Sequence, residues 1–83
     1  MNSSTTSEFR AAFAALPGDV QARARRAFAL WKKNPRHPSL RFKKAGQVWS
    51  VRIGGGYRAL GLLHGDTLYW FWVGTHDDYK ARL

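Results

Sequence analysis

The spacing of apolar residues changes once along the chain, and this change limits the folds that the chain can adopt. Before residue 35, apolar side chains recur every three or four residues, which places them on one side of a helix. From Leu40 onward they follow the shorter period of β-strands, and glycine-containing turns divide the segment into short runs. A block of helices followed by a block of strands is typical of an α+β fold.

Two helices are predicted in the first block. Ser7 is the expected N-cap of the first helix, and Pro17-Gly18 ends it. Asp19 begins the second helix, which Asn34-Pro35 terminates because the residue before a proline avoids the α conformation. The apolar stripes consist of Phe9, Ala12, Phe13 and Leu16 in the first helix and of Val20, Ala24, Ala27, Phe28 and Trp31 in the second. The short connection predicts an antiparallel helical hairpin.

Strands are expected at residues 40–44, 48–53, 57–63 and 67–73, and a short first strand at residues 3–6. The last three runs are joined by connections short enough for antiparallel hairpins. Thr75 should cap a brief terminal helix over residues 76–83, with Asp78 at the capping-box position. We therefore predict one domain over residues 1–83, with an N-terminal helical hairpin on one face of a small antiparallel sheet and a short C-terminal helix.

The run over residues 67–73 is apolar on both faces of its expected strand. Strict alternation would place Tyr69, Phe71 and Val73 on one side and Leu68, Trp70 and Trp72 on the other. A central strand buried on both faces would explain this composition. A concave aromatic surface that binds bases or a partner peptide is the alternative.

The chain is strongly basic. Fourteen Lys and Arg against five Asp and Glu give a formal net charge of +9, and residues 1–45 hold ten of the basic but only two of the acidic side chains. Such a field attracts polyanions, so nucleic acid or the ribosome is the expected partner. There is no cysteine, no apolar run long enough to span a membrane and no pattern of a secretory signal, so we expect a soluble, cytoplasmic protein.

Two arginines are expected to face each other across a hairpin turn. Ser50 and Arg52 alternate with apolar residues and so share one face of their strand, while Arg58 directly follows the glycines of residues 54–56. Guanidinium groups on a rigid sheet suit phosphate recognition. The glycines favour a hairpin turn over a phosphate-binding loop, because neither a Lys-Ser/Thr pair nor a helix follows them.

His76 is the candidate for proton transfer near neutral pH, in the polar cluster His76-Asp77-Asp78-Tyr79-Lys80. The simpler explanation is an exposed histidine in the first turn of a terminal helix. The other histidines, His37 and His64, have no metal-ligand spacing around them. We therefore predict no metal site and no cofactor.

Taken together, these segments resemble the RelE/ParE toxin superfamily over nearly the whole chain. The most specific are the hairpin that ends in Tyr57-Arg58 and the closing Gly74-Thr75-His76-Asp77-Asp78-Tyr79. The other matching segments are Phe9, Leu16-Pro17, Val20-Gln21, Asn34 to Lys43, Val48 to Ile53, Gly56 to Gly61 and Trp70 to Val73. The resemblance implies the toxin of a type II toxin–antitoxin pair, with a small acidic antitoxin as its partner.

The RelE branch of this superfamily consists of ribosome-dependent endoribonucleases that cut mRNA in the decoding site, without metal, by attack of a ribose 2′-hydroxyl on the adjacent phosphate. By resemblance, Arg52, Arg58, His76 and Tyr79 are the expected catalytic residues. Arg58 matches the family's arginine after the turn, His76 would protonate the leaving oxygen, and Tyr79 would stack on or orient the substrate. The expected RNA-binding residues are Arg41, Lys43, Lys44 and Ser50, the last of which stands where the family has a basic residue.

The ParE branch shares the fold and inhibits DNA gyrase without ribonuclease activity. Fold alone therefore leaves two other functions open, a gyrase inhibitor and a catalytically inert relative that binds nucleic acid. His76 and Tyr79 favour RNA cleavage among these alternatives.

Overall fold

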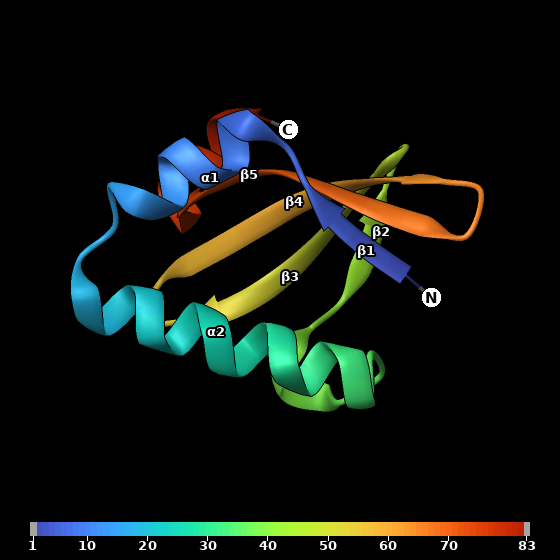
Figure 1. Cartoon of the computed structure of the whole chain (residues 1–83), viewed down its shortest axis with the longest axis horizontal. Coiled ribbons are helices and arrows are strands. Elements are labelled where there is room, and N and C mark those ends of the chain that lie inside the picture. Colours follow the sequence, from blue (N-terminus) through green and yellow to red (C-terminus); the bar gives the residue numbers. More distant parts are fainter. Residues whose placement is uncertain (1, 83) are drawn as a thin grey trace.

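The computed structural model describes residues 2–82, and the side chains of residues 2–81. The helices are α1 (Ser7–Ala14), α2 (Gly18–Lys33) and α3 (His76–Arg82), with a 3₁₀ turn, η1, at Pro38–Leu40. The strands are β1 (Asn2–Thr5), β2 (Lys43–Ala45), β3 (Val48–Gly54), β4 (Tyr57–His64) and β5 (Thr67–Thr75). They form one five-stranded sheet in the order β1-β5-β4-β3-β2 (Figure 1).

The predicted α+β fold, with a helical hairpin on the sheet and a short C-terminal helix, is confirmed. Strands β2 to β5 pair antiparallel, whereas β1 pairs parallel with β5, so the complete sheet is mixed. No helix among residues 2–82 is long and apolar enough to cross a membrane.

Helices α1 and α2 lie over the same face of the sheet (Figure 1). Their predicted stripes supply the helical side of the main core, with Phe9 from α1 and Ala24, Ala27 and Trp31 from α2. Phe28 joins the two layers, because its ring contacts Phe9 at 5.8 Å and Trp70 of β5 at 5.1 Å between centroids. Edge-to-face contacts of this kind favour tight aromatic packing, which compensates for the small size of the core.

Several boundaries differ from the prediction by a few residues, and two of these differences have clear local causes. Thr6, and not Ser7, is the N-cap of α1, since its Oγ1 accepts a hydrogen bond from the Phe9 backbone N–H at 3.1 Å. The strand predicted at residues 40–44 begins only at Lys43, because Leu40 closes the 3₁₀ turn and Arg41 has a left-handed φ of 44°. Thr75 does cap α3, accepting from the Asp78 backbone N–H at 3.2 Å. Residue 83, the last of the predicted helix, lies outside the described residues.

Strand β5 lies between β1 and β4 and is buried on both faces, but its side chains do not alternate strictly. The register with β4 shifts between Leu60 and Gly61, so Phe71 has no partner there. Trp70 and Val73 therefore both face the main core, while Trp72 packs on the other side with Leu60. The prediction that Trp70 and Trp72 share a face is wrong, because a β-bulge re-aims the side chains that follow it.

The sheet face opposite α1 and α2 bears a smaller apolar cluster of Leu60, Trp72 and Tyr79. Tyr79 comes from α3, so this helix packs against the face that the helical hairpin leaves free. Leu62 and Tyr69 lie opposite each other on β4 and β5 and are 44% and 40% exposed, so α3 covers only part of this face.

Candidate functional site

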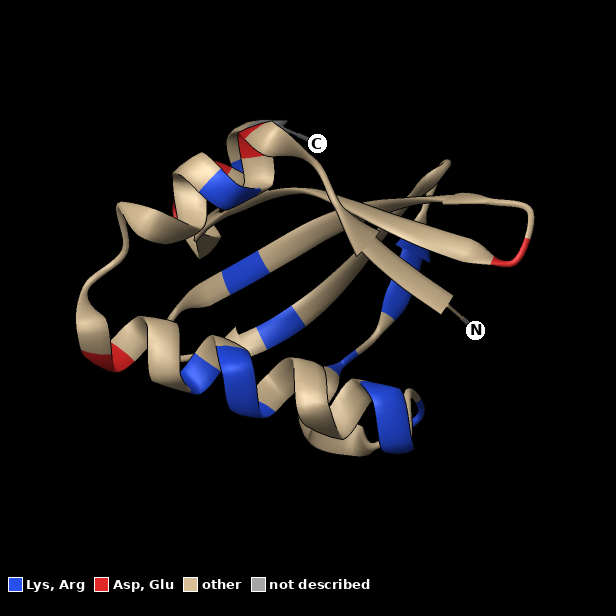
Figure 2. Ribbon diagram, in the orientation of Figure 1, with Lys and Arg blue, Asp and Glu red and all other residues tan. Residues whose placement is uncertain are grey.

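The predicted pair of arginines lies on the sheet face that α3 partly covers. Arg52 of β3 is directly opposite Arg58 of β4, and Ser50 is opposite Leu60, so these four residues share one face. The adjacent basic segments on β3 and β4 are visible in Figure 2. The prediction that Arg58 follows the hairpin turn and reaches the neighbourhood of Arg52 is confirmed.

Arg58 is buried although its side chain ends in a guanidinium group. Its side chain is only 7% exposed and donates one long hydrogen bond, 3.4 Å, to Ser50 Oγ. Among residues 2–82 no carboxylate lies within 4.0 Å of it. A buried charge is costly unless it is paired, so this site favours an anion supplied from outside the chain.

The cross-strand pairing adds a second reason for an external anion. Directly opposite side chains have Cβ atoms about 5 Å apart, and two like charges at that separation destabilise a sheet. Arg52 is exposed to solvent and Arg58 is not. A phosphate or carboxylate bound between them would replace this repulsion by two favourable interactions.

Helix α3 brings His76 and Tyr79 to the arginines. The His76 backbone N–H donates to the Gly56 carbonyl at 2.6 Å, which fixes the start of α3 at the β3–β4 turn. The His76 ring stacks on Tyr79 at 5.5 Å, and the Arg58 guanidinium carbon lies 5.0 Å from the Tyr79 ring centre. Tyr79 is thus in contact with both His76 and Arg58.

These residues surround a shallow hollow of about 370 Å³, which we call the arginine basin. Its lining consists of Arg41, Arg52, Gly56, Tyr57, Arg58 and His76. Arg41 directly follows η1 in a left-handed backbone conformation, and its side chain reaches the basin. Three guanidinium groups and one imidazole therefore face one solvent-accessible space, which is an arrangement suited to stabilising negative charge.

The remaining predicted residues occupy different positions. Ser50 is 1% exposed, so it contacts Arg58 and is not available to touch RNA directly. Lys43 is opposite Ser50 and shares the face of the basin, whereas Lys44 is opposite Trp49, whose ring packs against the main core on the other face. Tyr79 is 7% exposed, which leaves little of its ring free to stack on a base.

A second basic hollow, not singled out in the sequence, adjoins the basin. It also measures about 370 Å³ and is lined by Arg23, Arg26, Ala27, Leu30, Ser39, Leu40, Arg52, Ile53 and Gly54. Arg23 and Arg26 are three residues apart, a spacing that places both side chains on one side of α2. This spacing is visible in the sequence, but the strand that completes the hollow is not. Among residues 2–82 no group of three or more His, Cys, Asp or Glu is placed to hold a metal ion.

Comparison with known proteins identifies a domain family and solved structures with a similar fold. The sequence model of the ParE-like toxin domain matches residues 18–81, whereas no curated protein matches the chain at a significant level. The RelB–RelE antitoxin–toxin complex from Methanococcus jannaschii contains a similar chain, with a TM-score of 0.73, 17% identity and coverage of 95% of this chain and 96% of that one.

Two further solved structures show the same fold. The toxin–antitoxin complex RelBE2 from Mycobacterium tuberculosis has a TM-score of 0.67 and 20% identity, covering 89% of this chain and 95% of that one. The isolated E. coli RelE toxin has a TM-score of 0.66 and 12% identity, covering 99% and 98%. Because the ParE-like toxin domain matches more than half of the residues, this chain belongs to the ParE-like family of the RelE/ParE toxin superfamily.

Proposed function

We propose that this protein is the toxin of a type II toxin–antitoxin pair and that it cleaves mRNA in the decoding site of the ribosome. The observation that supports this function is the arginine basin, in which Arg41, Arg52, Arg58 and His76 face one hollow. The buried Arg58, without a carboxylate partner among residues 2–82, is the strongest single element of that arrangement.

The basin suits internal transfer at a phosphodiester. The ribose 2′-hydroxyl gives up its proton to solvent water as its oxygen attacks the adjacent phosphorus, the bond from phosphorus to the 5′-oxygen breaks, and a 2′,3′-cyclic phosphate forms. Negative charge develops on the phosphate oxygens, where Arg52 and Arg58 stabilise it. His76 gives a proton to the departing 5′-oxygen, a transfer that histidine performs near neutral pH.

Two neighbouring residues act through these groups. Ser50 accepts the hydrogen bond from Arg58, and Tyr79 contacts both Arg58 and His76. Neither Ser50 nor Tyr79 lines the arginine basin, whereas Arg58 does, and this favours positioning over direct substrate contact for both. Arg41 and Lys43 are exposed on the same side and would contact the RNA backbone.

An acidic antitoxin is the protein partner that fits this surface. The solved complexes of RelE with RelB support such a pairing, as does the net charge of +9. An antitoxin segment with carboxylates over the arginine basin would neutralise Arg58 in place of the RNA phosphate. A gene for a small acidic protein next to this one would support the pair.

Inhibition of DNA gyrase is the second candidate function. Membership of the ParE-like family favours it, and so does Ser50, an uncharged residue beside Arg52 and Arg58. In that case the arginine basin would bind acidic groups of a protein without cleaving RNA.

Controlled expression in a bacterial host, with primer extension to map mRNA ends, separates these functions. We expect growth arrest with new 5′ ends inside translated codons. Arg58→Ala should reduce cleavage by about 100-fold or more, the usual effect of removing a transition-state donor. His76→Gln should reduce it by a similar factor because it removes the proton donor. Arg25→Ala is the matched control, since Arg25 lies over the Phe13 ring and lines neither basic hollow.

The other outcomes have distinct meanings. Arrest with intact mRNA and a DNA-damage response would support gyrase inhibition and contradict the nuclease. Growth without arrest would identify an inert relative. Because Arg58 is buried, thermal melting of purified Arg58→Ala must show a folded protein, and the more exposed His76 provides an independent variant.

A further inference from the structure

The second basic hollow lies between α2 and the end of β3, and we call it the α2 groove. Ala27 and Ile53, each 8% exposed, form part of its floor, while Arg23, Arg26 and Arg52 supply its charge. Its volume of about 370 Å³ equals that of the arginine basin.

The charge of the α2 groove is poorly neutralised by the protein itself. Asp19 lies 3.5 Å from Arg23 and is the one carboxylate that residues 2–82 place within ion-pair distance of an arginine here. The Asp19 side chain is 69% exposed, so the pair is solvated and weak. Arg26 and Arg52 have no such partner in the described part of the chain.

Arg52 lines both the α2 groove and the arginine basin. The two hollows are therefore neighbours on the surface, with one guanidinium between them. A strand whose reacting phosphate lies in the basin would pass Arg52 and bring its next phosphates to Arg26 and Arg23. Guanidinium groups bind successive phosphates through paired N–H donors, which makes a series of arginines suitable for a polyanion.

Arg23 of the α2 groove lies against the hairpin that bears Arg52 and Arg58. Its guanidinium lies against Gly55 of the β3–β4 turn, in space that a Cβ atom at Gly55 would occupy. The β3–β4 turn thus lies beside the α2 groove and is continuous with the strands that bear Arg52 and Arg58.

We propose that the α2 groove binds the phosphates of single-stranded RNA that flank the reacting phosphate. This inference rests on the proposed function for the identity of the anion. It adds a binding segment, Arg23 and Arg26, to a site that the sequence places only on the sheet and on α3.

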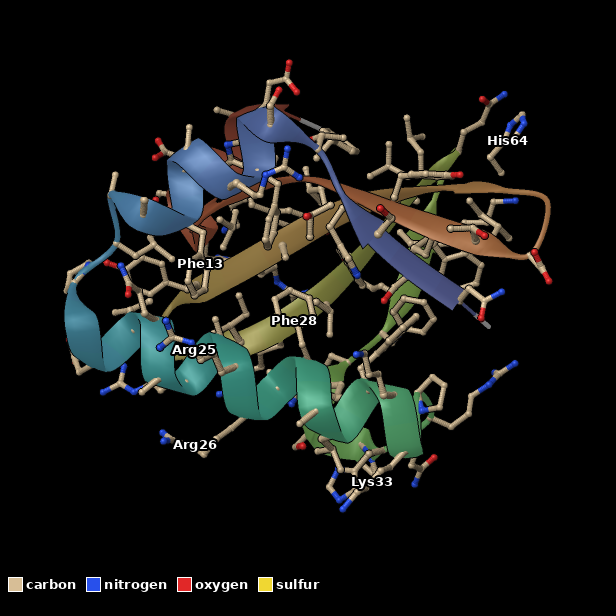
Figure 3. The ribbon with its side chains drawn as sticks, viewed as in Figure 1. Phe13, Arg25, Arg26, Phe28, Lys33 and His64 are labelled. Carbon is tan, nitrogen blue, oxygen red and sulfur yellow. The ribbon has the colours of Figure 1, made fainter. Side chains whose placement is uncertain are left out.

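Adjacent arginines on α2 allow a closely matched test. Figure 3 shows Arg26 directed away from Phe13, on the opposite side of α2 from Arg25. Arg25 lies over the Phe13 ring at 5.3 Å and lines a different hollow between α1 and α2. Arg25→Ala and Arg26→Ala therefore remove the same charge from neighbouring exposed positions, of which only one belongs to the groove.

The experiment measures the Kd of a 12-nucleotide 2′-O-methyl RNA over a series of salt concentrations by fluorescence anisotropy. The methylated sugar cannot be cleaved, so binding is measured independently of the nuclease reaction. For Arg26→Ala we expect roughly two- to fivefold weaker binding. The slope of log K against log salt should fall by about 0.7, the value for one phosphate contact in a single strand. Arg25→Ala should leave the slope unchanged.

Equal effects of the two variants would overturn the proposal, because net charge alone would then explain the binding. Failure of the wild-type protein to bind the RNA would overturn it as well. A glutamate-rich peptide measured in the same assay gives a further outcome. If Arg26→Ala weakened binding of the peptide but not of the RNA, the proposal would also be overturned, since the groove would then be a protein-binding surface. If Arg26→Ala weakens RNA binding more than Arg25→Ala does, but Arg58→Ala leaves mRNA cleavage intact, the α2 groove is supported as an RNA-binding surface and the proposed cleavage mechanism is contradicted.

Discussion

Arg58 combines features that a stable fold avoids, namely burial, a fixed positive charge and a second arginine directly opposite. Its internal partners are uncharged, the hydroxyl of Ser50 and the ring of Tyr79. Neither partner carries a negative charge that would neutralise the guanidinium. We attribute this arrangement to function, because the binding of an anion would compensate for its cost in stability.

Ser50 tests whether the orientation of Arg58 matters. Ser50→Ala removes a hydrogen bond to a charged group, so we expect single-turnover RNA cleavage to slow by roughly three- to tenfold. Ser50→Thr keeps the hydroxyl and should restore most of the rate. Thermal melting of both variants distinguishes positioning from stability: loss of activity in parallel with loss of melting temperature in both would contradict the positioning role.

At the scale of elements, two of the hairpin turns of the sheet, β3–β4 and β4–β5, provide a second comparison. Gly55 and Gly65 have φ values of +61° and +63°, and only the Cβ added at Gly55 would meet another group, the Arg23 guanidinium. Alanine at either site should cost about 1 kcal/mol because L residues disfavour this conformation. Since Arg23 is long and can move aside, we expect similar losses of stability for the two variants.

The Gly55→Ala and Gly65→Ala variants should differ in RNA binding. Gly55→Ala displaces Arg23 from the α2 groove and should weaken binding of the methylated RNA, whereas Gly65→Ala should not. Chemical denaturation and fluorescence anisotropy measure the two quantities on the same preparations. Equal RNA affinity of the two variants would show that the position of Arg23 against the turn has no role in binding.

Local patterns were sufficient to predict most of the elements. The stripes of α1 and α2 and the glycine turns depend on neighbours in the sequence, and they predicted the helical hairpin and the antiparallel strands correctly. The bulge at Phe71 and the parallel pairing of β1 depend on strands that are distant in sequence. The left-handed residue Arg41 was also not predictable, because this conformation is rare outside glycine.

The same division applies to the candidate site. The approach of Arg52 to Arg58 follows from a short hairpin, and the sequence predicted it. Burial of Arg58 and Ser50 follows from the packing of Tyr79 in α3 on the sheet, which no local pattern encodes. The α2 groove requires α2 and β3 to meet, which the sequence does not show. Arg23 and Arg26 were therefore indistinguishable from the solvated surface of a helix.

At the scale of the whole molecule, the two sides of the sheet bear different groups of residues. The side under α1 and α2 holds the main aromatic core, whereas the other side holds a smaller cluster and the arginine basin. The excess of positive charge extends from this basin to α2 (Figure 2). The main core and the arginine basin thus lie on different faces of one small sheet, and Arg52 lines both the basin and the α2 groove.

The chemistry of the RNA ends tests the central claim most directly. Purified toxin is added to ribosomes stalled on a defined mRNA, and the termini of any fragments are determined. Attack by the 2′-hydroxyl predicts a 2′,3′-cyclic phosphate and a 5′-hydroxyl at each cut, both absent with Arg58→Ala. Fragments with 5′-phosphate ends, or cutting that persists in the folded Arg58→Ala variant, would contradict the proposed role of the arginine basin.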